Sequence, residues 1–197
     1  MSAEASIYLE TERLELIPLA ERFADEMYDG LQSPELYEYI ADSPPPSPEW
    51  LRERYRRLET GRSSDSSELW LNWLVREKTT RRFVGHVQAT VKARSALVAY
   101  LLFLKAGGAG YAREAVAGML LSLERDYGVR EFVATVHAQN QRSIRLLERL
   151  GFTRRSFTKN AEIIRGEPTD EYRYVLNATL RRVDRTDRGS SPFPTRR

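Results

Sequence analysis

The sequence contains no cysteine and only two histidines. Without cysteine there can be no disulfide, no thiolate metal ligand and no cysteine nucleophile, and two histidines are too few for a histidine-rich metal centre. No apolar run approaches the ~20 residues of a membrane-spanning helix, and the first residues lack the basic and apolar regions of a secretory signal. We therefore predict a cytoplasmic protein with no metal site and no membrane contact.

A net positive charge is also lacking over most of the chain. The 197 residues carry a net charge of +3, and residues 181–197, with six Arg and two Asp, contribute +4, which leaves about −1 for residues 1–180. A nucleic-acid partner is therefore not expected for the body of the protein. We predict one domain over residues 1–180, long enough for a single core, followed by a disordered Arg-rich tail over residues 181–197.

Hydrophobic periodicity predicts a succession of strands and helices. Ser47 and Pro48 suit the N-cap and first position of a helix, and Gly128 suits the end of another. Strands are predicted at residues 12–19, 68–75, 82–91, 95–104, 129–136, 152–158 and 171–176, and helices at 20–31, 48–60, 110–128 and 140–151. This order predicts a fold of the α/β class, an α+β mixed sheet with helices against it, in which residues 97–136 supply the parallel pair.

Three glycines stand within four residues of the stretch LLFLKAGGAGYAREA, residues 101–115. The first N–H groups of a helix point outward and carry about half a positive charge, so glycines at that point let an anion sit on the backbone. An NTPase phosphate loop is excluded because no Gly in the chain is followed by Lys. A dinucleotide fingerprint would need a glycine in place of Arg113 and an acidic residue in place of His137. The loop is expected to hold another phosphate-bearing ligand, or else it only makes a tight turn.

Two motifs, in this order and spacing, resemble those of the GCN5-related N-acetyltransferase (GNAT) family, specifically its Rim-type branch of ribosomal-protein N-terminal acetyltransferases. The first is the family's Gln/Arg-x-x-Gly-x-Gly signature, and the second is its Asn-x-x-Ser...Leu-Gly-Phe signature. The matching residues are Lys105, Gly108 and Gly110, then Asn140, Ser143, Leu150, Gly151 and Phe152. The opening LETERLELIPL also looks like this branch. The resemblance covers residues 8–178 and implies the GNAT acyl-CoA N-acyltransferase fold, a central mixed sheet flanked by helices.

The resemblance implies that acetyl-CoA is the co-substrate. In similar proteins the strand before the glycine loop splays from the strand after the helix. The pantetheine arm pairs with the first strand, here at Leu102 to Leu104, and the pyrophosphate rests on the loop, here on the N–H groups of Gly107 to Ala112. Arg142 and Arg145 would contact the nucleotide end or are simply solvated. The residues implied to bind the coenzyme are Leu102, Phe103, Leu104, Lys105, Gly107, Gly108, Ala109, Gly110, Tyr111, Ala112, Asn140 and Ser143.

The resemblance implies one catalytic side chain, Ser143, beside the thiol. Ser143 would give a proton to the leaving thiolate, or it only helps to cap the helix that begins at Asn140. The general-acid tyrosine of many family members is replaced by Leu147. A backbone N–H near residues 102–104 would bind the oxyanion. The candidates for the general base are Tyr100, His86, His137 and Glu171.

A site without a strong base favours an amine of low pKa. Freeing a lysine amine at neutral pH costs about 4 kcal/mol, whereas freeing an α-amine costs about 1 to 1.4 kcal/mol. We expect an N-acetyltransferase that acts by direct attack in a ternary complex on a primary amine, that of a peptide or protein N-terminus or of a small molecule. The aromatic residues that frame the acceptor cleft, or else belong to the core, are Tyr37, Tyr39, Trp50, Trp70 and Trp73.

Two other functional classes stay open at this point. A non-catalytic acyl-CoA-binding module would keep the glycine loop and Asn140 while lacking an acid and a base, and Leu147 is the feature that favours it. A nucleic-acid adaptor would act through the tail at residues 181–197 and would bind with a steep salt dependence. A homodimer is one option for the assembly.

Overall fold

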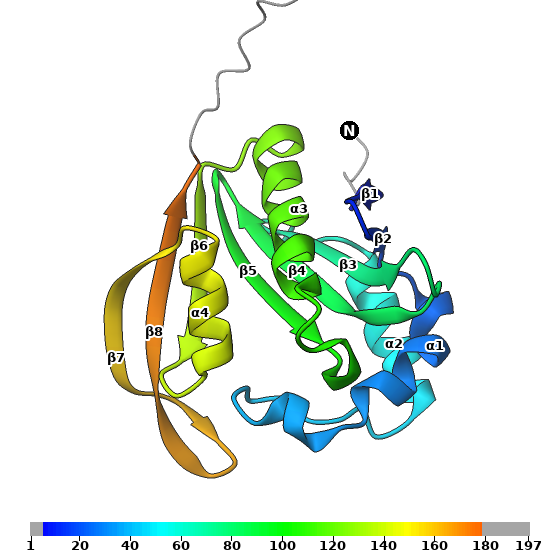
Figure 1. Cartoon of the computed structure of the whole chain (residues 1–197), viewed down its shortest axis with the longest axis horizontal. Helices are drawn as coiled ribbons and strands as arrows, with labels where there is room; N and C mark the ends of the chain where they lie inside the picture. Colours follow the sequence, from blue (N-terminus) through cyan, green and yellow to red (C-terminus); the bar gives the residue numbers. More distant parts are fainter. Residues whose placement is uncertain (1–5, 179–197) are drawn as a thin grey trace, which may run out of the picture.

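The computed structural model describes residues 6–178, which form one eight-stranded mixed sheet in the order β1-β2-β3-β4-β5-β6-β8-β7 (Figure 1). The strands are β1 (Leu9–Glu10), β2 (Leu14–Pro18), β3 (Leu69–Glu77), β4 (Phe83–Lys92), β5 (Ser95–Leu102), β6 (Glu131–His137), β7 (Thr153–Ile164) and β8 (Glu167–Asn177). The helices are α1 (Ala24–Tyr28), α2 (Pro48–Glu59), α3 (Tyr111–Asp126) and α4 (Gln141–Arg149). Short 3₁₀ turns are η1 (Glu21–Phe23), η2 (Asp29–Leu31), η3 (Pro34–Tyr37) and η4 (Leu104–Ala106).

The predicted fold class and the predicted order of the main elements are confirmed. Ser47 caps α2, since its Oγ accepts the N–H of Trp50 at 3.2 Å, and Pro48 occupies the first helical position. The helix expected at residues 20–31 is instead divided into η1, α1 and η2. The two last strands are longer than predicted and form a hairpin that ends the sheet. The tail predicted at residues 181–197 lies outside the described residues.

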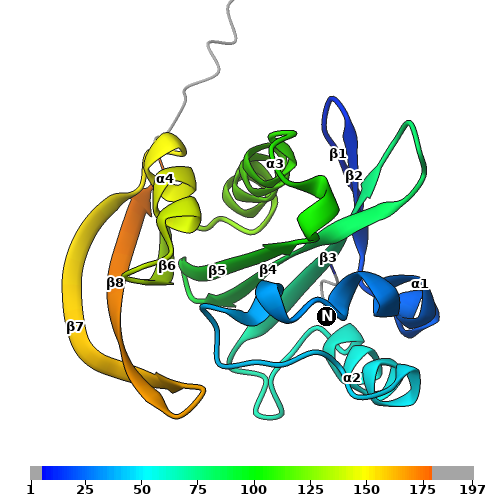
Figure 2. The ribbon, with the colours of Figure 1, turned by 60° about the horizontal axis from the view of Figure 1, so that its bottom comes forward.

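Helices cover the two faces of the sheet unequally (Figure 2). Side chains alternate between faces along each strand, so Val87 and Ala89 of β4 join the core beneath α3 and α4, whereas His86 and Gln88 turn to the opposite face. On that opposite face, α1 and α2 pack over only one side of the sheet, around Met27. Within residues 6–178, no helix combines the length and the apolar character that crossing a membrane requires.

The sheet opens between its two central parallel strands. β5 and β6 pair only at their first residues, at Ser95 with Glu131, Ala96 with Phe132 and Leu97 with Val133. Beyond these pairs β5 continues to Leu102 and β6 to His137, each held by its other neighbour. The parallel strand-helix-strand unit predicted at residues 97–136 is confirmed, and the two strands diverge at their carboxyl ends.

Candidate active site

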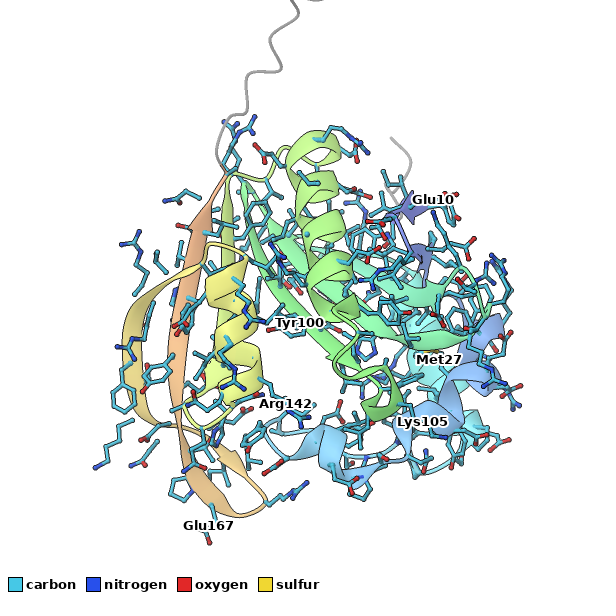
Figure 3. All side chains as sticks on the ribbon, viewed as in Figure 1. Glu10, Met27, Tyr100, Lys105, Arg142 and Glu167 are labelled. Atoms are coloured by element: carbon cyan, nitrogen blue, oxygen red, sulfur yellow. The ribbon has the colours of Figure 1, made fainter. Side chains whose placement is uncertain are left out.

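The divergence of β5 and β6 opens a cleft of about 1840 Å³. Its walls come from the carboxyl half of β5, the glycine loop, the start of α4, the η3 segment and β8. Tyr100 of β5, Lys105 of η4 and Arg142 of α4 are labelled around this opening in Figure 3. The cleft therefore joins elements that are far apart in the sequence, and it lies where ligands bind in open α/β sheets, beyond the carboxyl ends of the strands.

The edge of β5 that faces the gap has unused backbone groups. The N–H of Phe103 donates to the Val84 carbonyl at 2.8 Å, toward β4. Because the direction of backbone groups alternates along a strand, the N–H and C=O of Tyr100 and Leu102 face the gap instead. Of the three residues expected to pair with pantetheine, the structure thus leaves Leu102 available. Phe103 is engaged with β4, and Leu104 has already entered η4.

The glycine loop presents a run of unused N–H groups. The N–H of Gly107 donates to Leu104 O at 2.9 Å, and the first bond of α3 runs from Glu114 N to Gly110 O at 3.2 Å. Between them, within the described part of the chain, no hydrogen bond engages the N–H groups of residues 108–113. Gly108 and Gly110 have φ angles of +82° and +79°, which glycine adopts without strain.

The loop is suited to an anion such as a pyrophosphate. Free N–H groups at the start of a 16-residue helix combine with the positive end of its dipole. A Cβ at Gly108 would meet no atom within 4 Å, so the space over the loop is open. Two cationic side chains, those of Arg113 and Arg142, line the same cleft. Sequence reasoning missed Arg113, which it used only to exclude a dinucleotide fingerprint.

Ser143 and Tyr100 meet inside the gap. Asn140 is the N-cap of α4, and its Oδ1 accepts the N–H of Ser143 at 3.0 Å. Asn140 therefore does the capping, and the Ser143 hydroxyl is free to lie 2.7 Å from the Tyr100 hydroxyl. Burial raises the pKa of Tyr100 to about 12, although the hydrogen bond with Ser143 acts to lower it. The phenol therefore stays protonated at neutral pH. Leu147, which replaces the usual tyrosine, is buried in the core.

A second group of titratable side chains lies on the sheet face away from α3. His137 of β6 stands opposite Glu171 of β8 in the strand register. Burial raises the pKa of the Glu171 carboxyl, and the charge of Glu162 raises it further. Both carboxylates line the cleft, and the Tyr39 ring packs 5.2 Å from the His137 ring. A carboxylate with a raised pKa is a better proton acceptor than an ordinary one.

The remaining candidates are divided between cleft and core. His86 lines the cleft, and burial, followed by the charge of Arg54, lowers its pKa to about 4, which makes it neutral and a weak base. Trp73 is fully buried, with its Nε1 donating to Ile7 O at 2.7 Å. Tyr37 is buried as well but borders the cleft, together with Tyr39 and Trp50.

Comparison with known proteins gives a family and a set of structural relatives. Residues 13–153 match the acetyltransferase (GNAT) domain family. No curated protein sequence matches the chain.

Several solved structures share the fold at low sequence identity. One is an acetyl transferase from Salmonella typhimurium that modifies the N-terminal serine of ribosomal protein L7/L12, with a TM-score of 0.77, 17% identity and coverage of 88% of this chain and 100% of that one. Another is ribosomal-protein-S5-alanine acetyltransferase from Vibrio fischeri, with a TM-score of 0.74, 18% identity and coverage of 87% and 97%. A third is RimL in complex with coenzyme A, with a TM-score of 0.71, 18% identity and coverage of 87% and 98%.

Proposed function

The chain belongs to the GNAT family of acetyltransferases, and from this membership we propose the reaction that it carries out. It moves the acetyl group of acetyl-CoA to a primary amine by direct attack in a ternary complex. The acceptor is a peptide or protein N-terminus, with a small amine of low pKa as the second choice. One observation carries the proposal: the gap between β5 and β6 is bordered by the glycine loop, by Ser143 and by Glu171.

The two substrates enter the gap from opposite faces of the sheet. The glycine loop and the start of α4 lie on the α3 side, where the N–H groups of residues 108–113 would hold the pyrophosphate. The N–H and C=O groups of Tyr100 and Leu102 would pair with the pantetheine amides. One of these N–H groups can also bind the carbonyl oxygen as it becomes an oxyanion. Glu171 approaches from the other face, which leaves the thioester between a donor side and an acceptor side.

The Tyr100–Ser143 pair stabilises the leaving thiolate by a hydrogen bond. A thiol has a pKa near 8.5, and Tyr100 has a pKa of about 12, so full proton transfer from Tyr100 would be uphill by roughly 5 kcal/mol. We therefore assign Ser143 as the donor of a hydrogen bond to sulfur and Tyr100 as the group that orients it. The N–C bond forms as the C–S bond breaks, the amine nitrogen loses one proton to a base, and the thiolate takes its proton from solvent.

Glu171 is the base that the geometry favours among the four candidates. It lines the cleft, and burial together with Glu162 raises its pKa. His86 is a weaker choice, because its pKa of about 4 gives it no advantage over a carboxylate. Even a raised carboxylate pKa lies well below that of a lysine amine. An α-amine, with a pKa near 7.7 to 8.0, is deprotonated often enough for such a base to suffice.

The part of the cleft on the Glu171 face, where the acceptor would bind, has the shape and charge to receive the positively charged N-terminus of a polypeptide. Acidic side chains outnumber basic ones in this part of the cleft lining, where Arg54 pairs with Asp42; the acidic residues are Glu35, Glu38, Asp42, Glu162 and Glu171. Leu97 is 48% exposed in the middle of the sheet, because no helix within residues 6–178 covers this part of the face (Figure 2). An open cleft of this volume, with an exposed leucine among its lining residues, suits a polypeptide better than it suits a small metabolite. The named activity of the Salmonella typhimurium structure, acetylation of an N-terminal serine, is consistent with this acceptor class.

The test is an acetyl-transfer assay with matched peptides. The full chain is incubated with acetyl-CoA and a lysine-free peptide with a free N-terminus, or with the same peptide blocked at its N-terminus and extended by one lysine. Thiol release and peptide mass are measured. We expect the free N-terminus to react at least about tenfold faster, because its amine costs about 3 kcal/mol less to deprotonate. Faster acetylation of lysine would overturn the acceptor class.

A calorimetric titration with acetyl-CoA separates the remaining outcomes. Binding of acetyl-CoA without transfer to any amine would favour the acyl-CoA-binding module over the enzyme. Absence of binding would overturn the donor site itself. ATP and NAD serve as controls, because they carry a pyrophosphate or triphosphate without the pantetheine arm that the free β5 edge would recognise.

A further inference from the structure

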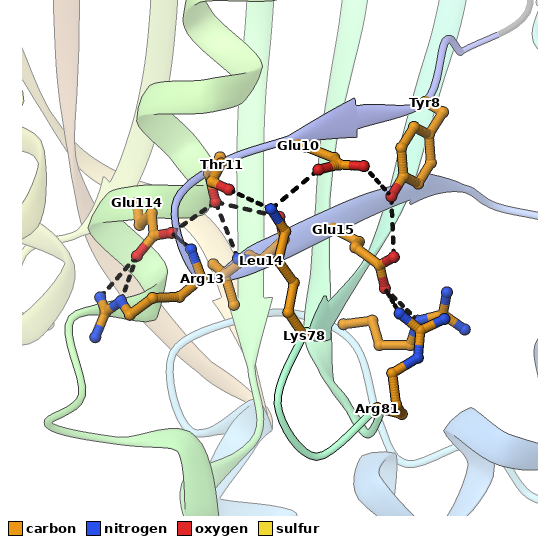
Figure 4. A network of polar contacts seen from close by, with 10 residues as sticks. Tyr8, Glu10, Thr11, Arg13, Leu14, Glu15, Lys78, Arg81 and Glu114 are labelled. Atoms are coloured by element: carbon orange, nitrogen blue, oxygen red, sulfur yellow. Dashed lines mark hydrogen bonds and ion pairs between the residues drawn. The ribbon is translucent and has the colours of Figure 1, made fainter.

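The turn between β1 and β2 docks against the first turn of α3 (Figure 4). Three groups of this turn donate to the Glu114 carboxylate: the Thr11 hydroxyl at 2.6 Å, the Arg13 backbone N–H at 2.7 Å and the Arg13 Nε at 2.7 Å. The Arg13 Nη2 also lies 2.7 Å from Oε2, so two guanidinium nitrogens meet this one oxygen, while Oε1 accepts from Thr11 and from the Arg13 N–H. Hydrogen bonds of this kind, between charged groups, are stronger than neutral ones. Burial opposes ionisation of Glu114, but the bonds from Thr11 and Arg13 outweigh it and lower its pKa.

The same face of α3 has a notch that receives this turn. Gly118 lies one helical turn after Glu114, and a Cβ at this position would come within 2.8 Å of the Thr11 Cγ2. Glycine within a helix costs about 1 kcal/mol relative to alanine. Its presence in α3 is explained by the close approach of Thr11. The turn is therefore seated on α3 by an apolar contact as well as by the carboxylate.

Arg13 connects this docking point to the glycine loop. Its Nη1 donates to the Ala109 carbonyl at 2.9 Å, and its guanidinium lies 4.7 Å from the centre of the Tyr111 ring. Tyr111 is fixed on its other side by a hydrogen bond from its hydroxyl to Glu77. These contacts use a carbonyl and side chains of the loop. The N–H groups of residues 108–113 stay available for a ligand.

We propose that Thr11, Arg13 and Glu114 form a clamp that holds the glycine loop in the conformation that receives the coenzyme pyrophosphate. They are positioning residues, because they act through the loop. This inference rests on the proposed function, since it takes acetyl-CoA as the ligand of the loop. The loop needs such support because residues 107–110 are exposed and three of the four are glycines, which have no side chain to pack. Ordering a glycine-rich loop before binding removes an entropy cost that the ligand would otherwise have to overcome.

The binding test compares Arg13→Met and Glu114→Gln with Arg81→Met as the matched control. Arg81 forms an ion pair of the same length with Glu15, 2.7 Å, and its side chain is 57% exposed against 45% for Arg13. The Kd for acetyl-CoA should rise about tenfold in each clamp variant, equal to about 1.4 kcal/mol. In Arg81→Met it should stay within about twofold. The double variant should be little weaker than either single variant, because both changes break the same pair.

A shortened donor gives a readout that a merely structural role would not move. S-acetylpantetheine keeps the thioester and the pantetheine arm but lacks the pyrophosphate. With acetyl-CoA, the clamp variants should raise KM about tenfold and leave kcat at saturation unchanged. With S-acetylpantetheine, kcat/KM should equal that of the wild type. Thr11→Val should reproduce the defect, and Thr11→Ser, which keeps the hydroxyl, should rescue it; this pair also replaces Arg13→Met if that variant does not fold.

Each outcome decides between the clamp and a simpler role. An equal loss with both donors, or a lower melting temperature with an unchanged Kd for acetyl-CoA, would overturn the clamp and leave a structural ion pair. A wild-type protein that does not bind acetyl-CoA would overturn the proposed function, and the clamp with it. A wild-type protein that binds acetyl-CoA while the clamp variants bind it equally well would overturn the clamp alone.

Discussion

Two alternative substitutions at Gly108 test whether the glycine loop binds phosphate. Gly108 has a φ of +82°, and a Cβ there would meet no atom within 4 Å. Asn and Asp tolerate this left-handed conformation better than other side chains, and they are nearly equal in size. Gly108→Asp places a carboxylate over the loop, and Gly108→Asn places a neutral amide there. Comparing the two variants separates charge from backbone strain.

The expected effect follows from the distance between the new charge and the ligand. A carboxylate about 5 Å from one phosphate charge is repelled by roughly 0.8 kcal/mol in bulk water and by roughly 3 kcal/mol at an effective dielectric constant of 20. The loop is exposed, so the lower part of this range applies to each of the two charges of a pyrophosphate. We expect a difference of about 2 kcal/mol between the variants, roughly 30-fold in the Kd for acetyl-CoA.

Isothermal calorimetry with acetyl-CoA at two salt concentrations measures this difference. Repulsion between exposed charges weakens as the Debye length shrinks from about 10 Å at 0.1 M salt to about 3 Å at 1 M salt. The gap between Gly108→Asp and Gly108→Asn should therefore narrow at high salt, while both variants keep similar melting temperatures. Equal Kd values for the two variants at low salt would contradict this expectation, because they would show that no phosphate charge lies near residue 108.

Three further predictions concern the gap, the base and the sheet. Ser143→Ala should lower kcat by roughly 10- to 100-fold with little change in the KM for acetyl-CoA, and Tyr100→Phe should lower kcat less. Because the two hydroxyls act as a unit, kcat of the double variant should be little below that of Ser143→Ala, and steady-state kinetics in which the two losses of kcat multiply would contradict this. Because burial raises the pKa of Glu171 in the folded protein, the stability that its protonation confers is present at low pH and is lost as the pH rises through the folded-state pKa. Glu171→Gln should therefore raise the melting temperature at pH 7 more than at pH 4 while it removes the acidic limb of the kcat/KM profile, and an unchanged profile would exclude Glu171 as the base. Gly85 has a φ of +147°, and a Cβ there would lie 2.2 Å from Leu101 O, so Gly85→Ala should lower the free energy of unfolding by at least about 3 kcal/mol. A Cβ at Gly128 would meet open space, so Gly128→Ala should lower it by only about 1 kcal/mol, as measured by chemical denaturation.

Local signals predicted those parts of the fold that depend on neighbours in the sequence. The cap at Ser47 follows from two adjacent residues, and the parallel unit at residues 97–136 follows from the succession of strand, helix and strand; both are found in the structure. The segment at residues 20–31 is helical from Glu21 to Leu31, as predicted, but it is divided between 3₁₀ and α-helical turns. The regularity of so short a helix depends mainly on tertiary packing, here against α2, β3 and β4, which the sequence pattern does not reveal.

The side-chain partnerships of the site could not be predicted in the same way. Tyr100 and Ser143 are 43 residues apart, and Arg13 and Glu114 are 101 residues apart. No period or cap links such pairs, since their contact depends on how β5, α4, β2 and α3 are placed in three dimensions. The opening LETERLELIPL indicated a family branch, but only the structure shows that Thr11 and Arg13 of this stretch bind Glu114 of α3 and that Arg13 also reaches the Ala109 carbonyl of the glycine loop.

The proposed site depends on position more than on acid or base strength. Glu171 remains a weak base next to an amine, and the Tyr100 and Ser143 hydroxyls are too weakly acidic to protonate a thiolate fully. Holding two reactants in line can lower a barrier by about 7 to 11 kcal/mol, which exceeds what a single proton transfer contributes. Such a mechanism requires the coenzyme to be fixed along its length. Changes at the loop and at the clamp, remote from the thioester, should therefore weaken transfer at limiting acetyl-CoA by amounts comparable to the loss of a hydroxyl beside the sulfur.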